Sequence, residues 1–283
     1  MTLKIHKWRI FRFALFIVLS ISAQQIFAGA WPLKKGRSYY KIDFRYLSGN
    51  KIYNNNGDKI PVPQFTDITI GILASYGLTN DLTGFINFAP FRSSSIDTVT
   101  FLNNSDVEKK GVGDLSIGIK YGLFKIGETV ISGKFIAGIP IAETSPDGGL
   151  WIGRNDFNQS IGIEAGHSFY PSPIYLSGGL TLNNRTKGFS DEFRYILESG
   201  YKFSKKLLLI VRIHGQVSLK NGDSNIKGGF GVYSNNQQYI AYNAEMIYKI
   251  TEKFGVKAYY ESGTKGKNII SAPVINAGIL LAN

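Results

Sequence analysis

Alternation of apolar and polar residues is the dominant pattern along this 283-residue chain. In segment 207–219, Leu209 and Val211 fall on one face, whereas Arg212 and His214 fall on the other. Successive side chains of a strand point to opposite faces, so this period of two predicts strands with one apolar and one polar face. The expected strands span 38–48, 65–76, 82–91, 114–123, 129–140, 157–169, 174–184, 192–203, 207–219, 239–250, 254–262 and 271–282.

The connections between these strands alternate along the chain between tight turns and long polar loops. The tight turns fall near residues 79, 126, 171, 205 and 252. The long connections are expected at 49–64, 92–113, 141–156, 185–191, 220–238 and 263–270. Strands near the ~9–11 residues that cross a bilayer, joined in this order, are typical of outer-membrane barrels. We therefore predict an all-β fold, an antiparallel up-and-down transmembrane β-barrel of about 12 strands, with ten or fourteen as alternatives.

A soluble lipocalin or β-sandwich also alternates, but it buries its apolar face over a core. Charged residues recur here on the polar face of nearly every strand, which argues against a soluble protein. In the membrane barrel the tight turns are expected to be periplasmic and the long connections to face outward. Seven aromatic residues then fall at one level, as an inner aromatic girdle: Tyr40, Tyr76, Tyr121, Phe169, Tyr201, Phe203 and Tyr248.

The start of the chain has the features of a secretory signal peptide. It carries four basic residues, Lys4, Lys7, Arg9 and Arg12. The apolar run 13–19 follows, and then small residues at Ala28 and Ala30. The run is shorter than the ~20 residues of a membrane-spanning helix. We expect residues 1–30 to be a signal peptide cleaved after 28 or 30, residues 31–283 to be the barrel, and the location to be the bacterial outer membrane.

The net charge and the absence of cysteine argue against several classes of function and of site. Of the 32 basic residues, four lie in the signal peptide, which leaves 28 against 20 acidic residues, a net charge of +8. These basic residues are scattered singly, so a nucleic-acid partner is not expected. There is no cysteine, which excludes a lipoprotein anchor, disulfides and thiolate metal sites. No metal-ligand spacing or phosphate-binding loop is evident, and we expect no cofactor.

Several short segments resemble a known group of outer-membrane proteins. They are Gly29-Ala30-Trp31-Pro32-Leu33-Lys34-Lys35-Gly36 with Tyr39-Tyr40, Tyr76-Gly77-Leu78-Thr79, Gly113-Asp114 with Lys120-Tyr121-Gly122-Leu123, and Asp191-Glu192 with Gly200-Tyr201. The sequence resembles the putative MetA-pathway-of-phenol-degradation family, which is related to outer-membrane transporters of hydrophobic compounds. The resemblance implies passage of small, aromatic or hydrophobic molecules. It carries over no site residue.

The polar strand faces supply the candidate functional residues, because they would line the lumen. These candidates are Lys41, Asp43, Arg45, Asp67, Lys120, Lys134, Glu164, Arg194, Glu198, Arg212, Glu245, Lys257 and Glu261. They would form a charged constriction that selects solutes, or a lumen plugged by mutually paired charges. Lumen-facing glycines would leave room for a narrow passage; they are Gly71, Gly118, Gly162, Gly166, Gly179 and Gly200.

The favoured function is a passive outer-membrane channel for small solutes, and not an enzyme. One alternative is a closed barrel with an adhesion or receptor role, suggested by Phe101, Leu102 and Val107 in loop 92–113. A second alternative is a lipid-modifying enzyme. The only histidines beyond residue 30 are His167, expected at the periplasmic end, and His214, so catalytic chemistry is not favoured. Expected partners are outer-membrane lipids, the barrel-assembly machinery during biogenesis and the solute.

Overall fold

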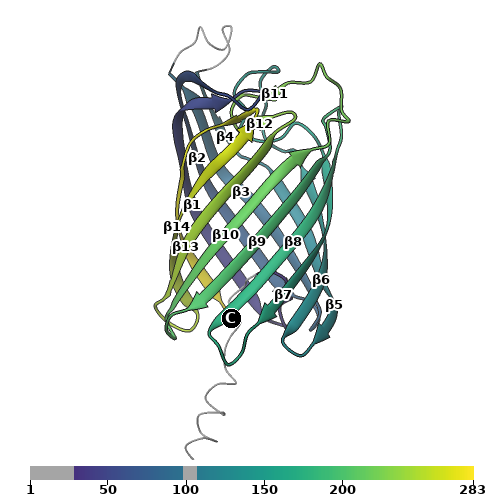
Figure 1. Cartoon of the computed structure of the whole chain (residues 1–283), viewed down its shortest axis with the longest axis vertical. Helices are drawn as coiled ribbons and strands as arrows, with labels where there is room; N and C mark the ends of the chain where they lie inside the picture. Colours follow the sequence, from purple (N-terminus) through teal and green to yellow (C-terminus); the bar gives the residue numbers. More distant parts are fainter. Residues whose placement is uncertain (1–28, 98–106) are drawn as a thin grey trace, which may run out of the picture.

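The structure is a computed structural model that describes residues 29–97 and 107–283. Its principal element is one closed antiparallel barrel of twelve strands (Figure 1). The barrel strands are β1 (Ser38–Tyr53), β2 (Lys59–Gly77), β3 (Leu82–Ile96), β5 (Leu115–Ile126), β6 (Thr129–Ile139), β7 (Asn158–Ser168), β8 (Ile174–Arg185), β9 (Glu192–Lys202), β10 (Leu207–Ser218), β13 (Gln238–Lys249), β14 (Phe254–Lys267) and β16 (Val274–Ala282). The predicted strand count and order are confirmed.

Pairing of the first strand with the last closes the barrel. Tyr40 on β1 lies opposite Ala74 of β2 on one side and Leu281 of β16 on the other. Every other neighbour along the sheet is the next barrel strand in the sequence, so the connections run up and down. Closure leaves no unpaired sheet edge, which satisfies the backbone hydrogen bonds that lipid cannot make.

Burial in the strands is the reverse of that in a soluble protein. Along β13, Tyr242 and Met246 on one face are exposed, whereas Asn243 and Glu245 on the other face are buried. The same alternation marks β8. Apolar residues therefore cover the outside and polar residues line the inside, as membrane barrels require. The seven girdle aromatics are all exposed.

Four short strands lie outside the barrel circuit, and several barrel strands are longer than expected. The short strands are β4 (Glu108–Gly111), β11 (Gly228–Gly229), β12 (Tyr233–Ser234) and β15 (Ile269–Ile270). Most of the expected loops 49–64 and 263–270 is strand, because β1, β2 and β14 extend into them. The sequence did not indicate these extensions because the few apolar residues there, such as Ile52 and Val62, are separated by the polar run 54–59, although the backbone pairing continues.

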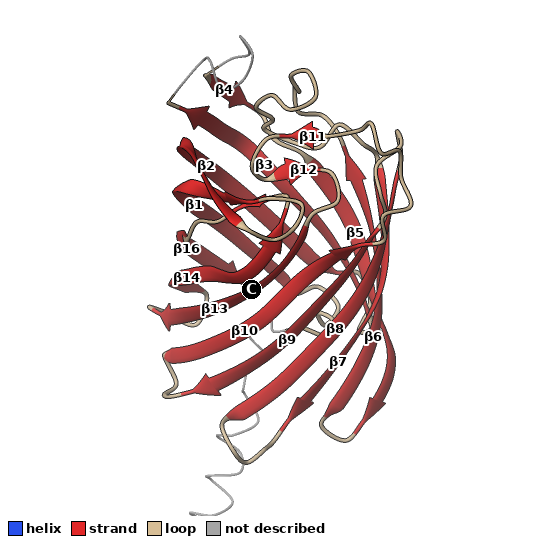
Figure 2. Cartoon of the chain, turned by 45° about the horizontal axis from the view of Figure 1, so that its top comes forward, coloured by secondary structure: helices blue, strands red, loops and turns tan. Residues whose placement is uncertain are grey.

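The two ends of the barrel differ in their connections. The turns between β2 and β3, β5 and β6, β7 and β8, β9 and β10, and β13 and β14 gather at the short-turn end, at the bottom of Figure 1. The other connections gather at the long-loop end, and Figure 2 shows β11 and β12 over the barrel mouth there. Among the described residues, no helix is long and apolar enough to cross a membrane.

Candidate functional site

A chain of ion pairs runs along the wall at the middle of the lumen, and Arg212 is one of its members. Arg212 on β10 bonds to Glu198 of β9 through Nε and to Glu245 of β13 through a terminal guanidinium nitrogen. The hydroxyl of Tyr175 on β8 donates to Glu198 over 2.8 Å. One cation therefore neutralises carboxylates on both neighbouring strands, which keeps this buried group of charges compensated.

The chain of charges continues from Glu245 to the first barrel strand. Lys257 on β14 lies 3.5 Å from Glu245 and 3.2 Å from Asp43 of β1. Lys41 lies 2.9 Å from Asp43. We call the whole series the central belt; its charged members are Lys41, Asp43, Glu198, Arg212, Glu245 and Lys257. Three positive and three negative side chains alternate along it.

The opposite wall holds a smaller cluster with an excess of positive charge. Lys120 on β5 and Lys134 on β6 both lie 2.7 Å from the carboxylate of Glu164 on β7. Glu164 is buried, and it is the only acidic group that the two lysines contact in the described part of the chain. This cluster therefore contributes one net positive charge to the lumen.

All thirteen predicted lumen residues take part in ion pairs. Beyond the two groups above, Arg45 pairs with Asp67 and Arg194 with Glu192, and Glu261 lies 3.1 Å from Nε2 of His214, which makes an ion pair when that histidine is protonated. This pairing agrees with the prediction of mutually compensated charges. Each candidate therefore has a charged or hydrogen-bonding partner beside it, although the Lys120, Lys134 and Glu164 cluster keeps one positive charge in excess.

The start of the described chain lies inside the lumen near the short-turn end. Lys120 donates to the carbonyl of Gly29, and Ser132 of β6 donates to the carbonyl of Ala30 over 2.5 Å. The amide of Leu33 donates to the hydroxyl of Thr83 on β3 over 2.7 Å. These partners lie on the neighbouring strands β3, β5 and β6, whereas Leu33 packs against β10, β13 and β16 on the other side of the lumen. Residues 29–37, the N-terminal segment, therefore cross the lumen.

An apolar collar holds this segment. Leu33 packs against inward-facing Leu208 and Ile210 of β10, Ile247 of β13 and Leu280 of β16. Trp31 meets the ring of Tyr175 edge-on, with centroids 5.8 Å apart. Apolar side chains on an inner wall were not predicted, yet a signal exists in the sequence. Residues 207–211 are apolar without interruption, which indicates a strand that is apolar on both faces.

The lumen-facing glycines leave less room than their number suggests. A methyl group at Gly118 would lie 2.3 Å from Phe85, and one at Gly200 would lie 1.9 Å from Tyr175. At Gly166 the ring of Trp31 lies 2.6 Å away. Large neighbouring side chains thus fill the space at these positions, whereas nothing approaches Gly71 within 4 Å. The expected room for a passage is reduced by these aromatic rings.

At the long-loop end, ion pairs are buried more deeply. Asp67 has no exposed surface; its carboxylate receives bonds from Arg45 at 3.1 Å, Arg92 at 2.9 Å and Ser94 at 2.6 Å. The guanidinium of Arg92 also stacks on Tyr233 of β12, 4.6 Å from its centroid. An inward loop strand is therefore tied to the wall of the barrel.

Arg185 is the centre of a second buried group at the same end. Its guanidinium lies 2.7 Å from Asp156 and 3.0 Å from Glu192, and it stacks 4.3 Å over the ring of Phe189. Arg154 lies 3.6 Å from Glu192. Burial opposes the charge on Arg154, but Glu192 and Asp156 raise the pKa of its guanidinium above the ordinary value. Asp156 and Glu192 are therefore buried and paired with arginines, although both lie at the ends of long loops.

Two long loops join over this end. Phe230 donates from its backbone to Gly149 over 2.8 Å, and Gly148 donates to Gly228 over 2.7 Å. Trp151 is buried beneath them and donates to the carbonyl of Ser145 over 2.8 Å. The Asp67 and Arg185 groups with these loops form what we call the outer cover. Sequence reasoning did not identify Arg92, Trp151 or Arg185, because the alternation of a single strand carries no information about inter-loop pairing.

The two histidines of the described residues, His167 and His214, belong to separate sites. His167 is bonded through Nδ1 to Thr129 over 2.8 Å near the short-turn end, as predicted. His214 lies 3.1 Å from Glu261 in the lumen. In the described part of the chain, no group of three or more His, Asp or Glu side chains is placed to hold a metal ion. Phe101 and Leu102 of the proposed adhesion loop lie outside the described residues.

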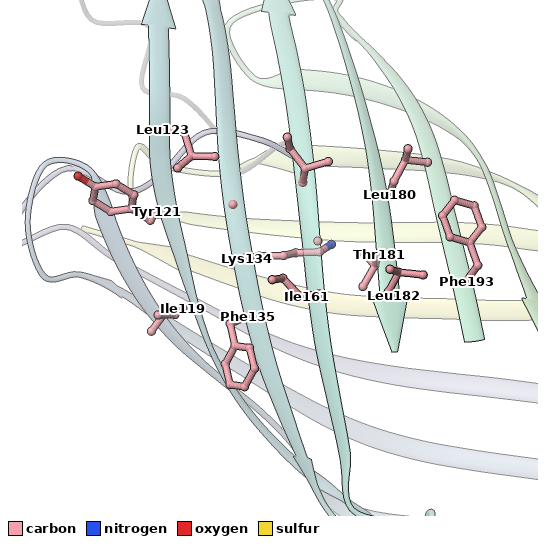
Figure 3. A pocket seen from close by; sticks show the side chains of 13 residues that line it. Ile119, Tyr121, Leu123, Lys134, Phe135, Ile161, Leu180, Thr181, Leu182 and Phe193 are labelled. Carbon is pink, nitrogen blue, oxygen red and sulfur yellow. The ribbon is translucent and has the colours of Figure 1, made fainter. Parts of the chain in front are cut away.

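A groove of about 570 Å³ lies on the outer wall rather than in the lumen. Outward side chains line it, including Tyr121, Phe135, Ile161, Leu180 and Phe193 (Figure 3). Strands β5 to β9 supply them, and Gly133 opens its floor. The groove is apolar and belongs to the surface that faces lipid in a membrane barrel.

A closed twelve-stranded barrel with an apolar outside and a lumen of paired charges is a transmembrane β-barrel of the outer-membrane class. A family model described as putative MetA-pathway of phenol degradation matches residues 49–271. The chain belongs to this family.

Solved structures share the fold at low sequence identity. An outer-membrane channel from Pseudomonas putida F1 is similar with a TM-score of 0.70 and 14% identity, covering 92% of this chain and 100% of that one. The NanC porin is similar with a TM-score of 0.50 and 8% identity, covering 85% and 98%. No curated protein sequence matches the chain significantly.

Proposed function

We propose that this protein is an outer-membrane channel that passively admits small solutes. The carrying observation is the lumen itself, in which charged and hydroxyl side chains form a polar lining beyond the apolar collar of the short-turn end. A barrel of twelve strands is narrower than the 16–18-stranded porins that hold open aqueous channels. The proposal therefore concerns a narrow passage with strong selection by size and charge.

The direction of the barrel follows from its connections. The short-turn end faces the periplasm and the long-loop end faces outward, which is the usual arrangement of bacterial barrels. Lipids surround the apolar wall, and the barrel-assembly machinery inserts it. In this orientation a solute meets the outer cover first, then the central belt, and finally the N-terminal segment.

The N-terminal segment narrows the proposed passage near the short-turn end. It crosses the lumen, and hydrogen bonds from Lys120 and Ser132 and one to Thr83 hold its backbone there. A short segment held by a few hydrogen bonds and one buried leucine moves at a lower free-energy cost than a strand of the wall. Conduction therefore depends on how this segment is seated.

Planar-bilayer recording tests the proposal. We expect small conductance steps from the purified protein and larger steps from Trp31→Ala combined with Leu33→Ser, because both changes loosen the segment. Lys34→Ala with Lys35→Ala is the matched control, since neither residue belongs to the apolar collar. If the protein and the loosened variant both fail to conduct while remaining folded, the channel proposal is overturned.

Small aromatic compounds are the solutes to examine first. Trp31, Tyr39 and Tyr175 place aromatic rings around the narrow point, and the family description refers to phenol degradation. Neutral phenols cross lipid unaided, so charged probes are sharper. Uptake of benzoate, benzylamine and glucose into liposomes should differ, with benzoate entering fastest because Lys120 and Lys134 leave a net positive charge. Equal uptake rates for the three compounds would contradict the proposed preference for an aromatic anion.

A further inference from the structure

A preformed cleft of about 540 Å³ lies at the long-loop end, outside the lumen. Three segments that are far apart in the sequence border it: the tip of the β1–β2 hairpin, the loop 219–237 and the connection after β14. Its volume lies within the ~300–1,000 Å³ typical of small-molecule sites. The loop 219–237 also belongs to the outer cover, but none of the charge pairs of the lumen lines this cleft.

Asn268 fixes the three segments to one another. Its amide nitrogen donates to Asn55 over 3.3 Å and to the carbonyl of Asn236 over 3.2 Å. Its backbone N–H donates to the carbonyl of Asn54 over 3.3 Å. Asn235 is anchored from beneath, because it accepts from the backbone of Ser190 over 3.1 Å and donates to Ile226 over 3.0 Å. The walls are therefore held in place without a ligand.

The floor and the walls differ in chemistry. Ile52, Val62 and Phe230 form the floor and belong to, or pack on, a buried apolar cluster. Amide and hydroxyl groups form the walls, which include five asparagines and two serines. A sugar ring has an apolar C–H face and a rim of hydroxyl groups, and each hydroxyl both donates and accepts. Asparagine amides also offer both functions, so this wall matches that rim.

Several of these groups still have unused hydrogen-bonding capacity. The amide nitrogens of Asn55 and Asn236 and the amide oxygen of Asn268 have no hydrogen-bond partner among the described residues. Lys227 forms no ion pair within the same part of the chain. The lining contains no carboxylate. The charge balance therefore disfavours a cation and suits a neutral or singly negative ligand.

We propose that this cleft binds a hydroxyl-rich saccharide, neutral or singly negative, at the outer rim of the barrel. The saccharide lays its C–H face on Phe230 and Ile52, and its hydroxyl groups bond to the asparagine walls. Lys227 lies at the edge, where it attracts a carboxylate or phosphate on the sugar. The ligand is either a free saccharide or the sugar part of a surface lipid, since both present the same chemistry.

Saturation-transfer NMR on the full protein tests this proposal, in an amine-oxide detergent because maltoside headgroups would compete. The probes are N-acetylglucosamine, maltose and glucuronic acid in one arm and purified lipopolysaccharide in the other. We expect binding in at least one arm, weakened about tenfold by Asn55→Ala or Lys227→Ala through loss of one hydrogen bond or charge contact. Ser224→Trp should abolish it by filling the cleft.

Asn225→Ala is the matched control, since Asn225 is an exposed asparagine of the same loop that does not line the cleft. It should bind like the unchanged protein. Binding to lipopolysaccharide alone identifies a lipid-linked sugar, and binding of the simple sugars identifies a free one. Absence of binding in both arms, or equal losses from Asn225→Ala and Asn55→Ala, would overturn the proposal. Channel conductance is not involved, so failure of the channel proposal leaves this one intact.

Discussion

The two ends of the lumen are closed by different physical means. At the short-turn end, Leu33 and Trp31 of the N-terminal segment insert into an apolar collar on the inner wall. At the long-loop end, buried carboxylates such as Asp67 and Asp156 are tied to arginines and covered by loops. Apolar contacts are non-directional and tolerate sliding, whereas a buried ion pair is costly to break. The comparison indicates that the short-turn end is the easier one to open.

The largest expected effect comes from breaking the outer cover. Arg185→Ala leaves Asp156 buried without its ion-pair partner and removes one of the three arginines around Glu192. Removal of one partner of such a buried pair costs about 3–5 kcal/mol. Denaturant unfolding and limited proteolysis of the loops would measure this loss. Lys110→Ala is the control, because its pair with Glu108 is exposed and contributes little. A cost below about 1 kcal/mol would show that the Arg185 group does not hold the cover.

A smaller effect is expected at the apolar collar. Leu33→Ala removes a buried leucine, and such changes cost about 2–5 kcal/mol in a rigid core. For Leu33→Ala we expect a cost at or below the lower end of this range, because the N-terminal segment can leave the collar while the barrel stays closed. Protease cleavage near the N-terminus should rise, with no change in the unfolding midpoint of the barrel. Equal changes in both would contradict the independence of the two ends.

An engineered disulfide between the N-terminal segment and the wall tests whether the short-turn end must open. The chain has no cysteine, so Leu33→Cys with Thr83→Cys introduces a single pair where the backbone of Leu33 already contacts Thr83. Oxidation should reduce conductance, and a reductant should restore it, if the segment must move for solutes to pass. Lys110→Cys alone controls for the reagents. Unchanged conductance in the oxidised form would place the moving element elsewhere.

The smallest expected effect concerns ion selectivity. Lys120→Gln reduces the charge of the Lys120, Lys134 and Glu164 group from +1 to zero. The reversal potential in a salt gradient should move modestly toward cation preference. Lys125→Gln, an exposed neighbour on the same strand, should leave it unchanged. A shift of the same size from Lys125→Gln would indicate a general surface-charge effect.

The predictable part of this protein is its wall. The alternation of Tyr242 and Met246 with Asn243 and Glu245 depends only on neighbours within one strand, so it could be recognised before any fold was known. The thirteen lumen candidates followed from the same rule, and all lie in ion pairs. The choice of partners, such as Arg212 between Glu198 and Glu245, depends on strand register and could not be predicted in the same way.

The sequence by itself determined the class of fold, the inward and outward faces and the level of the aromatic girdle, because each follows from a period of two and from the spacing of turns. Only the tertiary structure decided what fills the lumen. Leu33 meets Ile210 across 177 positions of sequence, and Arg92 meets Tyr233 of β12 across 141 positions. Such contacts depend on three-dimensional proximity, which local pattern does not encode. The N-terminal segment and the outer cover therefore became visible only once the barrel was closed around them.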